Sequence, residues 1–304
     1  MANGEASEGS RGRPESGAQL AEQDNGAQLS EPARPVERVK IGARQVLRAA
    51  KLLSSDRALL RAALLPTVLT TLGCVLFAWL SASDHDADEG TALQAFIGAF
   101  LTLSAMPPTV LQRQWMRVGL VARTAVGTTP GELERPNERY LGMLWRETLK
   151  AMRQAVAVAI GLGPLLVLLH LLPYSAYTVA GVSAAWAGYW TIVDAFEIPM
   201  ELVPGKQGEL PPSWFERGFL KLASWRIPFF GWGARFAGWI AKPWRHEVRF
   251  TERHPWETLG FGLTAGLFLL IPGVGLFFRA IAISGATSLI AHCKESEAAL
   301  TPSG

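Results

Sequence analysis

Positive charge is missing from two long parts of this sequence. No lysine or arginine occurs in residues 62–112 or in residues 154–205. Both stretches are strongly apolar, and the segments around them are dense in arginine and lysine. Apolar runs that alternate with basic segments are typical of a chain that crosses a bilayer several times, with its basic loops on one side. The pattern excludes an ordinary soluble domain and predicts an all-α integral membrane protein.

Cysteine and catalytic motifs are also scarce. The chain has 2 cysteines, Cys74 within an apolar run and Cys293 near the C-terminus, too few and too far apart for a disulfide framework or a metal cluster. The sequence lacks a Gly-x-Ser-x-Gly elbow, a His-Glu-x-x-His pair, a P-loop and a dinucleotide fingerprint. Aromatic motifs for stacking on nucleic-acid bases are absent as well. We therefore expect no enzyme activity, no metal, no cofactor and no nucleic-acid partner.

The N-terminal region has the composition of a tail. Residues 1–36 are rich in Gly, Ser, Glu, Gln and Pro and contain no apolar run. Such a segment cannot bury a core, so we expect it to be disordered and cytoplasmic. It also lacks the basic and apolar regions of a secretion signal. The helical membrane domain is expected to cover residues 37–293, followed by a short tail at residues 294–304.

Residues 39–53 have the period of an amphipathic helix. The apolar positions recur at steps of three and four: Val39, Ala43, Val46, Ala50 and Leu53. The basic positions form a separate stripe: Lys40, Arg44, Arg48 and Lys51. This stripe would suit anionic lipid headgroups if the helix lies at the membrane interface. A solvated helix that lies against the protein's own loops fits the pattern equally well.

Two long membrane-spanning helices are predicted next. The first runs from Ala58 to Ala82, with Ser55 or Asp56 as its N-cap. Residues 83–90 follow as a short acidic turn on the outer side, where solvation explains its histidine and carboxylates better than a metal site does. The second helix covers residues 91–110 and is interrupted by two prolines. The basic segment that follows marks the cytoplasmic side.

Two helical hairpins complete the predicted membrane domain. Residues 154–173 and 175–196 form the first hairpin. Residues 259–291 form the second, which a Pro-Gly-Val-Gly segment at residues 272–275 divides. Its first arm, residues 257–271, would rise only about 20 Å as a helix, short of the roughly 30 Å hydrocarbon core. We therefore expect the last hairpin to be re-entrant, and an even number of crossings places both termini in the cytoplasm.

The segment between the hairpins has a different composition. Residues 202–255 interleave tryptophan and phenylalanine with arginine and lysine. This mixture is typical of a segment that lies in the headgroup zone of the cytoplasmic leaflet. An aromatic cage for a ligand is the alternative interpretation.

Several motifs in this pattern resemble one family. The best-matched motifs are His254–Gly262, Leu270–Gly275 and Gly285–Leu289, and weaker ones are Leu64–Pro66 and Ala185–Trp186 with Asp194. They are similar to those of the CysZ-like family, which shares its domain with etoposide-induced protein 2.4, and the resemblance covers residues 44–293. It implies two long transmembrane helices with two hairpins that only partly penetrate the membrane. It also implies a sulfate permease of the bacterial inner membrane.

A candidate anion site lies at the start of the first membrane helix. A helix N-terminus with flanking arginines offers both N–H donors and positive charge to a dehydrated anion. The residues that fit this description are Ser54, Ser55, Arg57 and Arg61. The resemblance implies a sulfate-binding element at residues 58–61, in which Arg61 matches one of the family's two arginines. The alternative is that both arginines are ordinary cytoplasmic anchors and that Ser55 and Asp56 only cap the helix.

Three ionisable residues lie within the apolar runs. Asp194 and Glu197 are three residues apart on one helical face, and Arg279 lies in the last hairpin. Because an unpaired charge is costly in a bilayer, we expect both carboxylates to pair with Arg279. Such a network would either clamp the two hairpins together or line an ion path.

The sequence therefore favours a permease or channel for a small oxyanion such as sulfate. Without an ATP site, transport would be passive or coupled to an ion. The bilayer, including its anionic lipids, is the expected partner, and half-penetrating hairpins favour a homo-oligomer because neighbouring copies would cover their backbone ends. A membrane adaptor or lipid-interacting protein that transports nothing is the alternative function.

Overall fold

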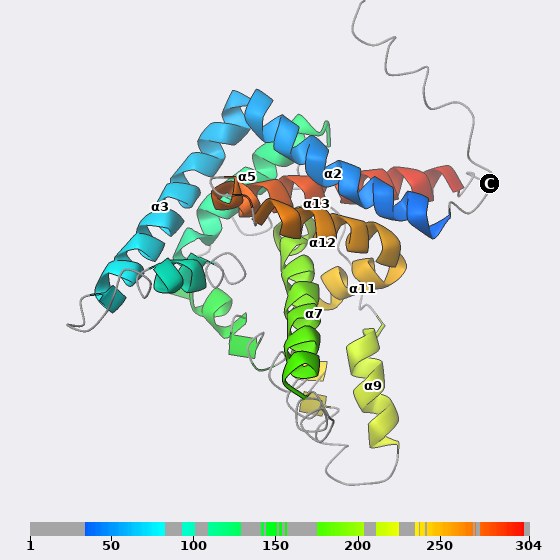
Figure 1. Cartoon of the computed structure of the whole chain (residues 1–304). Helices are drawn as coiled ribbons and strands as arrows, with labels where there is room; N and C mark the ends of the chain where they lie inside the picture. Colours follow the sequence, from blue (N-terminus) through cyan, green and yellow to red (C-terminus); the bar gives the residue numbers. More distant parts are fainter. Residues whose placement is uncertain are drawn as a thin grey trace, which may run out of the picture. The chain divides into compact units, whose positions relative to one another are not determined.

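The computed structural model describes most of the residues after position 33. The described residues are 34–82, 93–100, 109–128, 141–142, 144–150, 152–153, 156, 175–203, 211–224, 235–236, 238–240, 242–269, 271 and 274–300. Their regular structure is helical throughout, which confirms the predicted all-α class (Figure 1). The predicted acidic turn, most of the N-terminal tail and nearly all of the first arm of the first predicted hairpin lie outside the described residues.

The first two described helices meet at a corner. Helix α2 (Pro35–Ser55) ends one residue before helix α3 (Arg57–Ala82) begins. Asp56 occupies the corner and caps α3, because its Oδ1 accepts hydrogen bonds from the backbone N–H groups of Ala58 (2.7 Å) and Leu59 (3.2 Å). The bounds of α3 confirm the helix predicted over residues 58–82. In Figure 1 the two helices diverge sharply from this corner.

Two helices of the described chain are long and apolar enough to cross a membrane. The first is α3, whose candidate span Arg57–Ser81 has a mean hydropathy of 2.0 and is only 28% buried. The second candidate span, Gly275–Ser296, has a mean hydropathy of 1.4, is 72% buried, and combines the short 3-10 helix η3 (Gly275–Phe277) with most of α13 (Phe278–Leu300). The second span therefore falls in the segment that the sequence pattern assigned to a half-penetrating hairpin.

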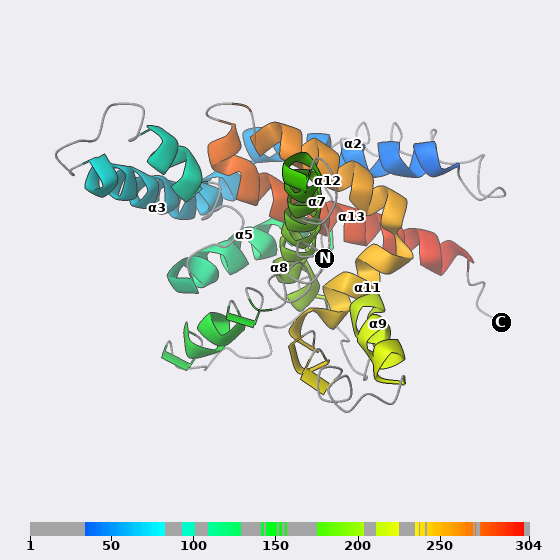
Figure 2. The ribbon, with the colours of Figure 1, turned by 60° about the horizontal axis from the view of Figure 1, so that its bottom comes forward.

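The C-terminal helices are separated where the sequence predicts a break. Helix α12 (Pro255–Leu269) has 15 residues and rises about 22 Å, less than the hydrocarbon thickness. Helices α12 and α13 lie side by side in Figures 1 and 2. The re-entrant path itself stays a prediction, supported by the length of α12.

Helix α2 packs along this C-terminal pair. Its buried residues, which form one face, are Gly42, Gln45, Val46, Ala49 and Leu53. This face contacts both α12 and α13, and Gln45 Oε1 accepts a hydrogen bond from Ser288 Oγ at 2.7 Å. One face of α2 thus lies against the protein's own helices rather than its loops, and an interfacial position for the basic stripe stays a prediction.

The core lies where α2, α3, α5, α8 and the C-terminal pair meet. Helix α5 (Gln112–Ala125) follows the 3-10 helix η1 (Thr109–Leu111) and packs on α3 and α13. Helix α7 (Ser175–Ala195) is followed at Phe196 by the short helix α8 (Glu197–Glu201). The Phe196 ring is fully buried, with its centroid 5.0 Å from that of Phe250 and 5.1 Å from that of Phe261. These contacts hold the end of α7 in the centre of the molecule.

The Trp-rich segment forms a smaller packed unit. It contains α9 (Trp214–Ala223), the 3-10 helix η2 (Lys242–Trp244) and α11 (Arg245–Arg253). Trp244 is buried against Trp190 of α7, with ring centroids 5.9 Å apart, and Trp214 Nε1 donates to the hydroxyl of Tyr189 at 2.9 Å. Part of the aromatic content of residues 202–255 is therefore used to attach this segment to α7.

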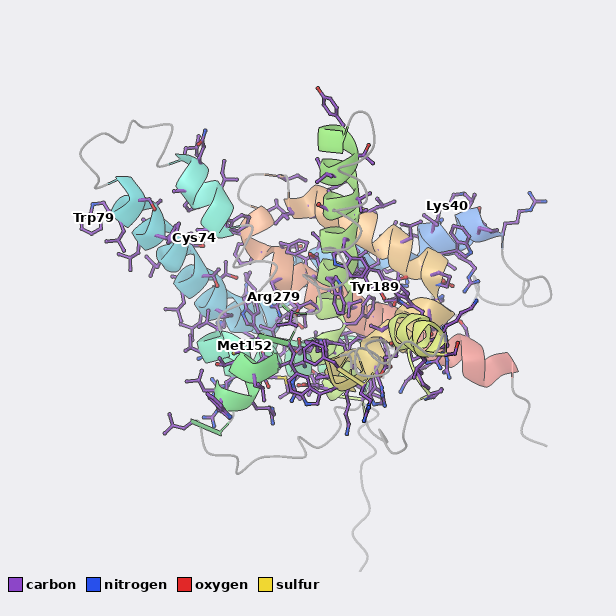
Figure 3. The ribbon with its side chains drawn as sticks, turned by 90° about the horizontal axis from the view of Figure 1, so that it is seen from below. Lys40, Cys74, Trp79, Met152, Tyr189 and Arg279 are labelled. Atoms are coloured by element: carbon purple, nitrogen blue, oxygen red, sulfur yellow. The ribbon has the colours of Figure 1, made fainter. Side chains whose placement is uncertain are left out.

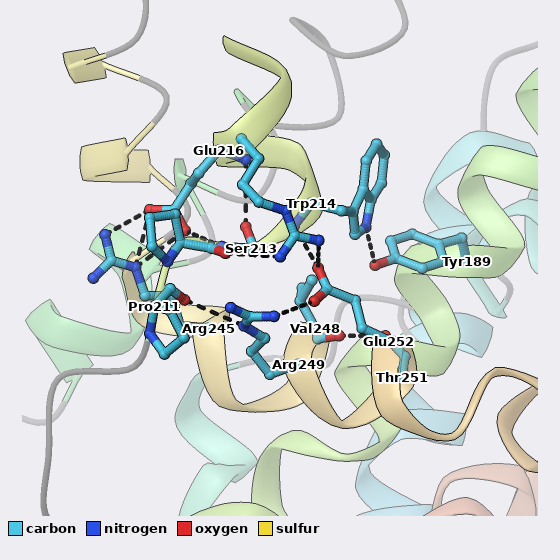
Figure 4. A network of polar contacts seen from close by, with 12 residues as sticks. Tyr189, Pro211, Ser213, Trp214, Glu216, Arg245, Val248, Arg249, Thr251 and Glu252 are labelled. Carbon is cyan, nitrogen blue, oxygen red and sulfur yellow. Dashed lines mark hydrogen bonds and ion pairs between the residues drawn. The ribbon is translucent and has the colours of Figure 1, made fainter. Parts of the chain in front are cut away.

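Ion pairs fix α9 to α11 (Figure 4). Ser213 and Glu216 form a capping box at the start of α9, in which Glu216 Oε2 accepts from the backbone N–H of Ser213 at 2.7 Å. The same carboxylate receives a fork of hydrogen bonds from Arg245, the shortest at 2.6 Å. Glu252 on α11 accepts from the backbone N–H of Trp214 and pairs with Arg249 at 2.8 Å. Charged and capping groups therefore line the contact between α9 and α11, so this side of the Trp-rich unit is polar.

Candidate functional site

The predicted anion site lies at the corner between α2 and α3. Its two serines already donate their hydroxyl hydrogens to α2: Ser54 Oγ to Lys51 O at 2.7 Å, and Ser55 Oγ to Leu52 O at 3.2 Å. The Asp56 carboxylate occupies two backbone N–H groups at the start of α3. The donors that the sequence analysis assigned to the helix N-terminus are therefore used within the chain, and Ser54 and Ser55 have no hydrogen left for an anion in this conformation.

Arg57 and Arg61 remain as the anion-binding candidates. They are four residues apart, so they lie on one face of α3, and both are exposed. Within the described residues, neither guanidinium forms an ion pair with a carboxylate. Because Asp56 adds one negative charge beside them, the two arginines leave this corner with a net positive charge. An exposed anion could therefore be held by the side chains alone.

A buried ion pair joins α7 to α13. Arg279 Nη1 donates to Asp194 Oδ2 at 2.7 Å, and both side chains are almost fully buried. The guanidinium carbon of Arg279 also lies 5.8 Å from the centre of the Trp115 ring on α5. Figure 3 shows Arg279 among the helices rather than at the outer edge of the molecule. The structure thus brings together two of the three charges that the sequence analysis placed within the apolar runs.

Glu197, the third charge, pairs with a lysine that the sequence analysis did not single out. Lys150 Nζ lies 2.7 Å from Glu197 Oε1 and 3.5 Å from Glu201 Oε1. Gln112 Nε2 donates to the same Glu197 oxygen at 3.4 Å. This contact was not predicted, and the direct pairing of Glu197 with Arg279 stays a prediction. The signal in the sequence was indirect: Glu197 and Glu201 are one turn apart in a stretch without any cation, so their partner had to come from another segment.

Charge compensation outweighs burial at the Lys150 pair. Burial alone would lower the pKa of Lys150, but Glu197 and Glu201 raise it above its ordinary value. The ammonium of Lys150 is therefore charged at neutral pH and compensates the buried carboxylate of Glu197. At the neighbouring Glu147, by contrast, the effect of burial is larger than that of Lys150, and burial raises the pKa of the carboxyl.

Among the buried charges, Asp194 with Arg279 and Glu197 with Lys150 form two ion pairs. Together these pairs connect helical residues 144–150, α7, α8 and α13. Such pairs can position helices, since removing one partner would leave an unpaired buried charge. In the described part of the chain, no group of three or more His, Cys, Asp or Glu side chains is arranged to hold a metal ion.

Comparison with known proteins places the chain in one family. The model of the family described as sulfate transporter CysZ/etoposide-induced protein 2.4 matches residues 45–279. The matched range contains the corner between α2 and α3 and also both buried ion pairs. No curated protein and no solved structure shows a significant match to the chain. Because the match covers more than half of the 304 residues, the chain belongs to the sulfate transporter CysZ/etoposide-induced protein 2.4 family, a family of membrane proteins related to sulfate transport.

Proposed function

We propose that this protein is a permease or channel for a small oxyanion, with sulfate as the favoured substrate. Arg57 and Arg61 carry the proposal, because their exposed guanidinium groups lie at the end of the candidate span Arg57–Ser81. A sulfate ion that leaves water must replace its hydration shell with hydrogen-bond donors and positive charge. Two guanidinium groups on one helical face supply both, in the planar geometry that suits an oxyanion.

The buried pairs have a supporting role in this proposal. Asp194 with Arg279, and Glu197 with Lys150, fix the positions of the helices around the path instead of binding the anion themselves. Their cations are already neutralised, so they attract a second anion weakly. The proposal also includes a multi-pass arrangement in a bacterial inner membrane with both termini cytoplasmic, and a homo-oligomer.

The test is uptake of labelled sulfate into vesicles that contain the purified full chain. Charge-assisted hydrogen bonds contribute about 1.5–3 kcal/mol each, so replacing both arginines in Arg57→Ala/Arg61→Ala should slow uptake at least tenfold at low sulfate concentration. The matched control is Arg113→Ala/Arg117→Ala, which removes two exposed arginines with the same spacing from α5. This control should transport sulfate at close to the unmodified rate.

Equal uptake by vesicles with and without the protein would refute transport. An equal loss of sulfate uptake in both double variants would refute the assignment of Arg57 and Arg61, because the removal of any two positive charges would then be enough to slow transport.

A function without transport, as a membrane adaptor or lipid-interacting protein, is the second candidate. The exposed basic stripe of α2 favours it, and it predicts no uptake by any of these proteins.

A further inference from the structure

Helix α2 presents a row of basic side chains on the side that faces away from the protein. Lys40, Arg44, Arg48 and Lys51 are all exposed. Figure 3 shows Lys40 at the outer edge of the molecule. The opposite face of α2 is buried against α12 and α13, so the helix cannot turn this row inward. The position of the row is therefore fixed by the core.

Most of these cations have no carboxylate partner in the described chain. Lys40 pairs with Glu37 at 2.7 Å, and this pair is exposed. Arg44, Arg48 and Lys51 form no ion pair with a described residue. Over its 11 residue steps the row is about 16 Å long. A row of this length suits several negative groups side by side better than one small ion.

An apolar stripe lies on the neighbouring helix α12. Its exposed residues are Trp256, Leu259, Leu263 and Leu267, with Leu263 and Leu267 more than 60% exposed. They recur at steps of three and four, so they share one face of α12. Leu47 on α2, between Arg44 and Arg48, is also exposed. The two helices are in close contact, and Arg38 on α2 pairs with Glu257 on α12 at 2.6 Å.

A cationic row on one helix and an apolar stripe on the helix packed against it match the two parts of the boundary between lipid headgroups and acyl chains. A soluble acidic protein would satisfy the cations but leave the leucines exposed to water. Hydrocarbon alone would cover the leucines but leave the cations unpaired. An anionic phospholipid satisfies both, because its phosphate can pair with the arginines while its chains cover the apolar stripe.

We propose that α2 binds anionic phospholipid headgroups through Arg44, Arg48 and Lys51, while Leu47 and the leucines of α12 contact the acyl chains. The bound lipid anchors α2 and the C-terminal helices at one membrane surface. This site is separate from the proposed anion contact at Arg57 and Arg61, and it does not depend on whether the protein transports sulfate.

The experiment measures lipid that is retained by the purified full chain. Delipidated protein in detergent receives equal amounts of phosphatidylglycerol and phosphatidylcholine, and native mass spectrometry counts the lipids bound. The unmodified chain should prefer phosphatidylglycerol. Arg44→Gln/Arg48→Gln should weaken that binding by about tenfold or more, since each basic residue near an anionic surface adds appreciably to attraction. The control Arg113→Gln/Arg117→Gln removes the same charge from α5 and should retain the preference.

A second measurement, of thermal unfolding, tests the proposal if a variant is poorly folded. Phosphatidylglycerol should raise the thermal midpoint of the unmodified chain and of the α5 control more than that of Arg44→Gln/Arg48→Gln, because a ligand stabilises the state that it binds. The proposal is overturned if both double variants retain equal amounts of phosphatidylglycerol, or if the two lipids bind equally to the unmodified chain. It is also overturned if inorganic phosphate gives the same stabilisation as the lipid, because the row would then be a simple phosphate site.

Discussion

Lys150 shows how a single residue determines whether a buried carboxylate is tolerated. Its ammonium contacts Glu197 directly and Glu201 at a longer distance, and both it and Glu197 are largely buried. Isolated charges in such surroundings cost several kcal/mol, whereas a well-placed pair recovers most of that cost. The carboxylates of Glu197, Glu201 and Glu247 raise the pKa of Lys150, and Lys150 acts to lower the pKa of Glu147. Removal of this lysine should therefore change the protonation of neighbouring carboxyl groups as well as remove one charge.

Replacing Lys150 with methionine should therefore make stability depend on pH. In the unmodified chain the raised pKa of Lys150 contributes stability that is complete below about pH 10.4 and is lost as the pH rises through the folded pKa. In Lys150→Met, the ammonium no longer compensates the burial of the Glu197 carboxylate, and burial disfavours the charged form of that group. The variant should lose about 3–5 kcal/mol at pH 8 and regain part of it at pH 5, where Glu197 binds a proton.

Thermal unfolding in detergent at pH 8 and pH 5 measures this difference. Because the pKa of Glu147 is raised, the unmodified chain should also gain some stability, though less, between pH 8 and pH 5. The quantity compared is therefore the change in stability with pH of the two proteins. The control Lys40→Met removes an exposed pair with Glu37 and should change stability by less than about 1 kcal/mol at both values. A Lys150→Met loss that is equal at pH 8 and pH 5 would show that the lysine acts only through its packing.

At the scale of elements, α2 and α12 approach each other through glycines. A Cβ atom at Gly42 would overlap the carbonyl oxygen of Glu257, and one at Gly260 would overlap the carbonyl oxygen of Val39. Only glycine permits the two backbones to come this close. The crossing packs α2, which carries the basic row, directly on α12, which carries the apolar stripe, so the proposed lipid surface depends on it.

Gly260→Ala should destabilise the protein, although alanine is the better helix former. The added methyl group must push the α2 backbone away, and overpacking of this kind costs about 1–3 kcal/mol. Gly266→Ala is the matched control on the same helix, because a Cβ there meets no atom within 4 Å. This control should be neutral or gain up to about 1 kcal/mol from helix propensity. Thermal unfolding of the two variants measures the difference, and a shift of the same sign in both would disprove the close crossing.

The sequence predicted faces and boundaries within elements better than contacts between them. The bounds of α3 follow from a long apolar run with an aspartate cap, and the exposed basic row follows from a period of three and four, because both signals are local. Gly260 lies in the predicted last hairpin, but the residue that it contacts in α2, Val39, is more than two hundred residues away in the sequence. Periodicity shows which side of a helix is apolar and does not show which helix covers it.

The same limit explains the outcome at the buried charges. Asp194 and Arg279 were recognisable because few ionisable residues interrupt the apolar runs, and each needed a partner. Lys150 lies in a segment with many other cations, so nothing in its sequence neighbourhood distinguished it from a solvated lysine. Ser54 and Ser55 fit the expected type of anion ligand, but their hydroxyl groups donate to the preceding turn, a contact that composition cannot predict.

For the whole molecule, the length of α13 raises the main question of topology. Its candidate span Gly275–Ser296 has 22 residues, enough to cross a bilayer completely, whereas α12 is too short to do so. If α12 and α13 form a re-entrant hairpin, the end of α13 returns to the side on which α2 lies. If α13 crosses completely, its end lies on the opposite side. The high burial of the span favours the hairpin, because most of its surface faces protein instead of lipid.

Cysteine labelling distinguishes these two arrangements. The native Cys74 and Cys293 are both buried, so the unmodified chain should give little background with a membrane-impermeant maleimide. Lys40→Cys places a thiol on the exposed side of α2, and Glu295→Cys places one on an exposed position near the end of α13. In intact spheroplasts we expect neither thiol to react, and after permeabilisation we expect both to react, since both termini are predicted to be cytoplasmic. Reaction of Glu295→Cys alone in intact spheroplasts would mean that α13 spans the bilayer and that the number of crossings is odd.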